Sequence, residues 1–238
     1  MDNYETTVVT TLCNYRKYIV DAIESFLKQD FTASDMVIVD DASTDNPYKV
    51  IKPFVSDRIK YIRLEKNGGY SRAKNIGIEN ARAEVLVMLD ADDMLTPTGI
   101  SSRYKRICEG YNLVHGPVLD WKKGEVTGRS RMWGNWLANH DHSNIHAQSV
   151  MLRKQIHREI GLYDESMWCK SDREMFARIF NRGYRIGYVE TDVAIYRHHS
   201  LQMHRSSQKM AANNRLTKEL HKKIESRKTD LSGIRLLV

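Results

Sequence analysis

Three carboxylates are concentrated in the stretch EVLVMLDADDML, residues 84–95, where Asp90, Asp92 and Asp93 directly follow an apolar run. The run Val85 to Leu89 is short and unbroken, which predicts a strand buried on both faces of a parallel sheet. Ligands of open α/β sheets bind at the carboxyl ends of the strands, so these acids belong to a predicted site. Because carboxylates this close repel one another, either a pKa must rise or a cation must bind.

A divalent cation is the simpler way to keep these acids together. Asp90 and Asp92 flank Ala91 and offer hard oxygen ligands of the kind that magnesium, manganese and calcium prefer. Such ions keep positions open for water or phosphate. The residues alone leave an alternative, a loop whose acids only cap the helix that begins near residues 96–98.

Strand and helix patterns alternate through the first hundred residues. Val85 to Leu89 is preceded by strand patterns at 6–12, 36–41 and 59–64, and helix patterns separate them. The last of these helices follows a glycine turn in NGGYSRAKNIGIENA, residues 67–81. This order predicts βαβ units, an α/β fold and a mostly parallel sheet.

The regularity fades after residue 100. The sequence predicts a helix at 101–110, a strand at 113–119 and a long loop region at 121–146 that carries tryptophans. A helix is expected from Ser171, with Ser171 and Glu174 as a capping box, and residues 185–199 are expected to form a hairpin-like pair of strands.

Composition bounds the class of protein. The chain has 238 residues, of which 41% are hydrophobic and 28% charged, as in ordinary globular proteins. No apolar run approaches a membrane span and the N-terminal residues do not resemble a signal peptide, so we expect a soluble cytoplasmic protein. Cys13, Cys108 and Cys169 are far apart and odd in number, which argues against a disulfide framework or a zinc site.

Charge is unevenly distributed along the chain. Residues 1–100 hold 12 Lys and Arg against 16 Asp and Glu, whereas residues 101–238 hold 25 against 14, a net charge of +11. This asymmetry predicts an anionic partner for the second half, such as a phosphate-rich ligand, a membrane surface or nucleic acid. A solvated basic surface is the alternative.

Seven segments, taken in order, resemble the motifs of the GT-A inverting glycosyltransferases called family 2. They are VVTTLCNYRKYI, VIVDDASTD, NGGYSRAKNIGIENA, VLVMLDADDML, GLYDE, SDREMFARI and YRHHS. The resemblance implies one Rossmann-like GT-A domain over residues 1–200, with a nucleotide-binding half (1–100) and an acceptor-binding half (101–200). Residues 201–238 are then a basic, mostly helical C-terminal extension.

The resemblance also implies roles on the donor side. Thr11 and Asp41 match positions that hold the base and ribose of a nucleotide, although many relatives have proline where Thr11 stands. Gly69 permits close approach of the backbone, and Lys74 would face the phosphates. Asp90 also matches the donor site.

A metal-binding set follows from the same resemblance. Asp90 and Asp92 match the DxD motif, which holds Mn²⁺ or Mg²⁺ against the donor diphosphate. His199 fits the spacing of a further metal ligand better than His198 does, and either ring is otherwise a surface residue of the predicted hairpin.

Asp172 matches the general base of the family. Met175, Phe176 and Ile179 lie on the same side of the predicted helix, so Asp172 is expected to begin its buried face and to look into the cleft. The alternative is a simple helix-capping role. The family usually has an acid where Ser171 stands, and this departure weakens the assignment.

The implied function is a metal-dependent inverting transfer of a sugar, with a UDP-sugar as the favoured donor, to an acceptor hydroxyl. The expected acceptor is a polysaccharide or a lipid-linked glycan, with peripheral contact at the inner membrane face through the basic tail. One alternative is glycosylation of hydroxymethylated DNA bases, and another is a catalytically inactive sugar-nucleotide binding module. Trp121, Trp133 and Trp136 are candidate platforms for the acceptor.

Overall fold

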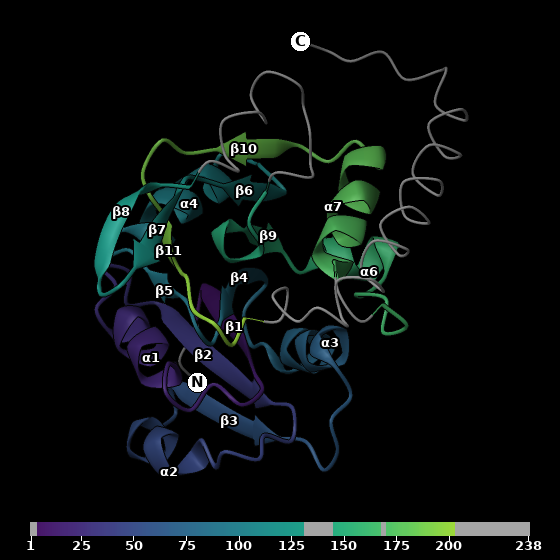
Figure 1. The fold of residues 1–238 in the computed structure, drawn as a ribbon. Coiled ribbons are helices and arrows are strands. Elements are labelled where there is room, and N and C mark those ends of the chain that lie inside the picture. Colours follow the sequence, from purple (N-terminus) through teal and green to yellow (C-terminus); the bar gives the residue numbers. More distant parts are fainter. Residues whose placement is uncertain (1–3, 131–144, 168–169, 203–238) are drawn as a thin grey trace.

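The computed structural model describes residues 4–130, 145–167 and 170–202, and these form a three-layered α/β fold beside a smaller sheet (Figure 1). The main sheet has seven strands in the order β10-β6-β9-β4-β1-β2-β3. Their bounds are β1 Thr6–Leu12, β2 Ser34–Asp40, β3 Ile59–Arg63, β4 Val85–Asp90, β6 Leu113–His115, β9 Met151–Arg153 and β10 Ile186–Tyr188. The predicted α/β class is confirmed.

The sheet is mixed, and only β9 runs against its neighbours. Strands β2, β1 and β4 lie side by side and parallel, β3 is parallel to β2, and β10 is parallel to β6. Strand β9 pairs antiparallel with β4 and β6. The predicted mostly parallel sheet is confirmed, with β9 as its antiparallel strand.

Strand β4 shows why the sheet needs helices on both faces. Val85, Val87 and Leu89 pack into one apolar cluster, and Leu86 and Met88 pack into another on the opposite face. The first cluster is covered by α1 (Ile19–Leu27), α2 (Tyr48–Ile51) and α4 (Gly99–Cys108), and the second by α3 (Tyr70–Asn80), α6 (Gln155–Ile160) and α7 (Ser171–Asn181) (Figure 1). Side chains alternate across a strand, so an unbroken apolar run fits this two-sided burial.

A second sheet of four strands lies beside the first, in the order β5-β11-β7-β8. Its strands are β5 Met94–Leu95, β7 Val118–Lys122, β8 Glu125–Arg129 and β11 Ala194–Arg197. Strand β11 is parallel to β7, whereas β10 belongs to the main sheet. The predicted hairpin across residues 185–199 is therefore wrong, because the chain crosses from one sheet to the other between its two strands.

The register of the main sheet gathers the acidic strand ends at one edge. Thr11 of β1 lies opposite Asp90 of β4, and Leu12 lies opposite Asp40 of β2.

The described 3-10 helices are η1 (Lys52–Phe54) and η4 (Ala147–Ser149). Among the described helices, none has both the length and the apolar character needed to cross a membrane.

Candidate functional site

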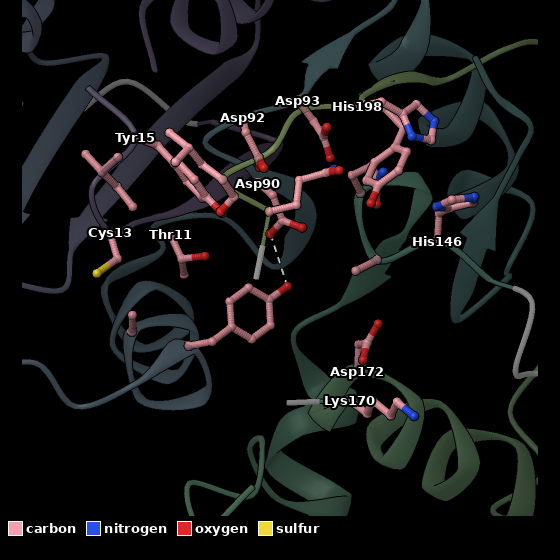
Figure 2. Close-up of a pocket in the computed structure, with 18 of the residues that line it drawn as sticks. Thr11, Cys13, Tyr15, Asp90, Asp92, Asp93, His146, Lys170, Asp172 and His198 are labelled. Atoms are coloured by element: carbon pink, nitrogen blue, oxygen red, sulfur yellow. Dashed lines mark hydrogen bonds between the residues drawn. The ribbon is translucent and has the colours of Figure 1, made fainter. Parts of the chain in front are cut away.

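A cavity of about 1340 Å³ opens at the carboxyl ends of β1, β2 and β4 and extends to the second sheet and the start of α7. Figure 2 shows Asp90, Asp92 and Asp93 on one side of this space and Asp172 across it. The predicted residues Thr11, Asp41 and Gly69 also line the cavity. Its volume exceeds that of an ordinary small-ligand pocket, so it has room for two substrates.

Asp41 secures the glycine turn that precedes α3. Its two carboxylate oxygens accept hydrogen bonds from the backbone N–H groups of Gly68, at 2.7 Å, and Gly69, at 2.9 Å. Gly69 has φ = +88°, a conformation that favours glycine. Each carboxylate oxygen keeps a second lone pair, so Asp41 can hold this turn and still accept from a ligand N–H.

Asp40 has a different role from its neighbour. Its carboxylate is buried and accepts from the backbone N–H of Ser43, from the Tyr61 hydroxyl and from the Arg63 guanidinium. These bonds use both carboxylate oxygens within the fold, and Asp40 is not among the residues that line the described cavity, so it braces the turn after β2.

Asp90 is held from below by two side chains of α3. The Tyr70 hydroxyl donates to Asp90 Oδ1 at 3.0 Å, and Lys74 Nζ lies 3.6 Å from the same oxygen. Lys74 is fully buried, and its ammonium lies 4.4 Å from the centre of the Tyr70 ring. The Lys74 ammonium therefore lies behind the Asp90 carboxylate. Lys74 is not among the residues that line the described cavity.

Asp92 meets a histidine that is 107 positions away in the sequence. His199 Nε2 lies 2.9 Å from Asp92 Oδ2, and the two side chains are 8% and 11% exposed. The His199 ring packs on Tyr18 and Tyr15. His198, in contrast, pairs with Asp120 at 3.0 Å. Of the two histidines, it is His199 that the structure brings to the predicted metal ligands.

These residues fit a divalent cation that is shared with a substrate. The Asp92 carboxylate, the His199 ring nitrogen beside it and the Asp90 carboxylate are the groups that would hold such a cation. No group of three potential ligands is assembled among the described residues. Magnesium and manganese sites built from one or two carboxylates are completed by water and substrate phosphate, so the small protein set suits this chemistry.

Asp93 relieves part of the repulsion in this acidic turn. Burial, together with the charges of Asp92 and Asp90, raises the pKa of Asp93 well above its ordinary value. Its Oδ1 accepts a hydrogen bond from the backbone N–H of Arg197 at 2.9 Å. Asp93 thereby ties the turn after β4 to β11, the strand that leads to His199.

Asp172 lies in the first turn of α7 and faces the cavity, as predicted (Figure 2). The predicted capping box is wrong. The N-cap residue is Lys170, in the left-handed region at φ = +57°, and Ser171 is already helical. Glu174 pairs with Arg178 at 2.8 Å instead of reaching back. No side-chain hydrogen bond caps this helix, and the Asp172 carboxylate lines the cavity.

The wall opposite the donor-side acids carries two polar pairs. Asp120 joins His198, and His146 Nε2 lies 3.0 Å from the Ser130 hydroxyl. Burial opposes ionisation of Asp120, but the hydrogen bond from His198 and the charge of Lys122 outweigh it and lower the carboxyl pKa. Burial lowers the pKa of His146 to about 4. His146 is therefore neutral near pH 7.

The sequence did not identify Tyr70, Asp120 or His146 as site residues. Tyr70 is four positions before Lys74, a spacing that places both side chains on one helix face. Because Lys74 was expected in the donor site, this spacing was the signal that could have identified Tyr70. Asp120 and His198 meet only because β7 and β11 pair in the second sheet. Trp121 is half-buried, and Trp133 and Trp136 lie outside the described residues.

This chain is similar to known proteins over most of its length. The family model described as Glycosyl transferase family 2 matches residues 7–202. Glycosyltransferase GlyG of Streptococcus pneumoniae is 24% identical over 216 residues, which cover 82% of this chain and 71% of GlyG. The poly(ribitol-phosphate) beta-N-acetylglucosaminyltransferase TarS of Staphylococcus aureus is 31% identical over 127 residues, covering 52% of this chain and 22% of TarS.

The fold has a close counterpart among solved structures. S. aureus TarS 1–349 in complex with UDP-GlcNAc superposes with a TM-score of 0.73 at 20% identity, over 85% of this chain. The chain spans 61% of that TarS chain. At this identity the likeness establishes the shared architecture.

Proposed function

This chain belongs to glycosyltransferase family 2, and we propose that it transfers a sugar from a UDP-sugar to a hydroxyl of a glycan acceptor. The transfer depends on Mn²⁺ or Mg²⁺ and inverts the anomeric carbon. The observation that carries the proposal is the arrangement across one cavity, with Asp90 and Asp92 on one side and Asp172 on the other, and with His199 paired to Asp92.

The donor lies along the carboxyl ends of β1 and β2. Thr11 and Asp41 line this end of the cavity and contact the nucleoside, with Asp41 accepting from the base. Gly69 has no side chain to obstruct the diphosphate, and its positive φ keeps the turn open. A fold neighbour that was solved with UDP and with UDP-GlcNAc supports the choice of a uridine donor.

Asp90, Asp92 and His199 are the residues that would hold the cation. When bound, the cation supplies a Lewis acid that stabilises negative charge on the departing diphosphate. Tyr70 and Lys74 fix the Asp90 carboxylate from behind. Contact of Lys74 with the donor phosphates stays a prediction from the resemblance. The burial of Lys74 favours a role in holding the Asp90 carboxylate.

Asp172 accepts the proton of the acceptor hydroxyl as that oxygen attacks the anomeric carbon. The bond between the sugar and UDP breaks on the opposite face, which inverts the configuration. Asp172 lies across the cavity from the acids that hold the donor (Figure 2), as this attack requires. An ordinary carboxylate is a weak base near neutral pH, so positioning supplies much of the effect.

The acceptor is a cell-surface glycan or a lipid-linked glycan. GlyG is named as a glycosyltransferase, and TarS is named as a poly(ribitol-phosphate) beta-N-acetylglucosaminyltransferase. The cytoplasmic location and the peripheral membrane contact stay predictions, since the tail from residue 203 lies outside the described residues. No feature of the described cavity favours a hydroxymethylated DNA base, and its combined carboxylates favour an enzyme over an inactive binding module.

The proposal is tested by measuring UDP release from a panel of UDP-sugars, with Mn²⁺ and with a chelator. We expect release with at least one donor, loss of release with the chelator and, once an acceptor is supplied, an inverted linkage by proton NMR. Release that is indifferent to the chelator contradicts the metal assignment. Absence of release with every UDP-sugar contradicts the donor assignment.

A further inference from the structure

The charges that line the cavity are separated between its two ends. The acids are Asp41, Asp90, Asp92, Asp93, Asp120 and Asp172, and the cations are Lys122, Arg129, Lys170 and Arg173. Four of the six acids lie at the donor end, whereas all four cations come from the second half of the chain. A site for a neutral acceptor has no need of this basic wall.

Three of the four cations, Lys122, Arg129 and Lys170, interact with other residues of the protein. Lys122 lies 3.5 Å from Asp120, and Arg129 pairs with Asp192 at 2.7 Å. Arg173 is half-buried in the first turn of α7, and no described residue forms a hydrogen bond or an ion pair with its guanidinium. Among the described residues, nothing competes with a ligand in the cavity for its charge.

Arg173 is also in a defined place relative to the chemistry. It follows Asp172 directly, and Lys170, the N-cap residue of α7, is two positions before Asp172. Figure 2 shows Lys170 beside Asp172 at the start of this helix. In the sequence, the proposed base is flanked by Lys170 and Arg173, and all three residues line the cavity.

From this arrangement we infer that the acceptor carries a phosphate group close to the hydroxyl that is glycosylated, and that Arg173 binds this phosphate. The planar guanidinium forms paired hydrogen bonds to phosphate oxygens, which a neutral glycan does not offer. The donor diphosphate is assigned to the opposite wall, so it does not use this cation. The inference rests on the proposed function and specifies its acceptor.

Two sources offer this chemistry. A polymer of polyols joined by phosphodiesters has a phosphate beside each free hydroxyl, and a sugar linked to a lipid through a diphosphate has one on the accepting sugar. Both satisfy the same contact with Arg173, so the test includes one compound of each kind.

The test compares two acceptors, diglycerol phosphate and diglycerol, which has the same hydroxyls and no phosphate. The donor is the UDP-sugar from which the enzyme releases UDP fastest. We expect kcat/KM to be about tenfold higher for the phosphodiester, the gain from one hydrogen bond to a charged group. In Arg173→Gln this preference disappears, and in Arg173→Lys part of it remains. Added salt reduces the preference in the wild-type enzyme.

The controls separate this inference from the proposed function. Arg182→Gln, the same change at the far end of α7, keeps the wild-type preference. The affinity of Arg173→Gln for UDP, measured by calorimetry, stays within about twofold of wild type. Use of a sugar–diphosphate–lipid in detergent, with the same dependence on Arg173, supports the inference and assigns the source.

Equal kcat/KM for diglycerol phosphate, the lipid-linked sugar and their neutral counterparts overturns the inference while leaving the transferase in place. Weakened binding of UDP by Arg173→Gln, with the acceptor preference intact, also overturns it, because the cation then serves the donor. Failure of the proposed function looks different, since no UDP-sugar is then consumed with any acceptor.

Discussion

At the scale of single residues, Asp172 separates the chemical step from binding. It lines the cavity with no helix-capping task, so its replacement removes a base without loosening α7. We expect Asp172→Asn to lower kcat about 10²- to 10⁴-fold, the range for general-base catalysis, with UDP affinity unchanged. Stopped-time transfer assays and UDP calorimetry measure the two effects. Asp57→Asn, at an exposed acid far from the cavity, keeps full activity, whereas an active Asp172→Asn rules out this base.

Tyr70 gives a second prediction at this scale. Its hydroxyl donates to Asp90 Oδ1 at 3.0 Å, so Tyr70→Phe removes one bond that orients a proposed metal ligand. We expect the Mn²⁺ concentration for half-maximal UDP release to rise about tenfold, within the range for loss of an outer-shell partner. A Mn²⁺ titration of UDP release measures this. Tyr48→Phe, at an exposed tyrosine, should titrate like wild type, and the same behaviour in Tyr70→Phe contradicts the role.

That Asp41, Asp90 and Asp92 line one cavity was largely predictable, because they lie at strand ends that the local pattern indicates. Asp90 and Asp92 follow an apolar run, and Asp41 follows another. Lys74 shows the limit of this reasoning, because its burial beneath Tyr70 depends on how α3 packs against the sheet. The resemblance implied that Lys74 faces the donor phosphates, whereas the structure buries it next to Asp90.

At the scale of elements, α7 is held to the loop before it by Arg178. The guanidinium donates to the carbonyls of Ile160 and Leu162 and pairs with Glu174. We expect Arg178→Met to lower the free energy of unfolding by about 2 kcal/mol, as for loss of several buried hydrogen bonds. Urea unfolding measures this.

The same variant reports on the position of the base. Because α7 carries Asp172, Arg178→Met should also lower kcat while UDP affinity is kept. Arg182→Met, at the exposed end of the helix, controls for loss of a charge. Unchanged stability and unchanged kcat in Arg178→Met would show that this clamp does not position the helix.

Elements after residue 100 were harder to predict, and β10 and β11 show why. Both strands were recognised, but the pairing of β10 with β6 and of β11 with β7 joins segments about 70 positions apart. Strands of three or four residues have no pattern that selects a partner, so the local hairpin was the default. The start of α7 was predicted one residue too late. Ser171 was expected to be the N-cap residue, but this position is taken by Lys170 in a left-handed backbone conformation.

At the scale of the whole molecule, three buried histidines make stability depend on pH. Burial lowers the pKa of His115 to about 3 and those of His146 and His157 to about 4. An unfolded histidine has a pKa of about 6.5, so between about pH 6.5 and 4 the unfolded chain binds more protons. The free energy of unfolding therefore falls as pH is lowered through this window. The raised pKa of Asp93 acts in the opposite sense, but it is one group against three.

Urea unfolding of the metal-free protein at a series of pH values measures this dependence. His157→Met removes one titrating group that lies away from the cavity, so its stability should fall less steeply with acid than that of wild type. A stability that is constant between about pH 7 and 5 would contradict the linkage.

The central claim for the whole molecule is that a cation shared by the donor and the protein occupies the acidic edge of the sheet. Calorimetry of UDP binding, with and without Mn²⁺, tests it most directly in the wild type, Asp92→Asn and His199→Gln. We predict that Mn²⁺ strengthens UDP binding at least about tenfold in the wild type, and that either substitution removes most of this gain. An equal gain from Mn²⁺ in all three proteins would contradict the claim.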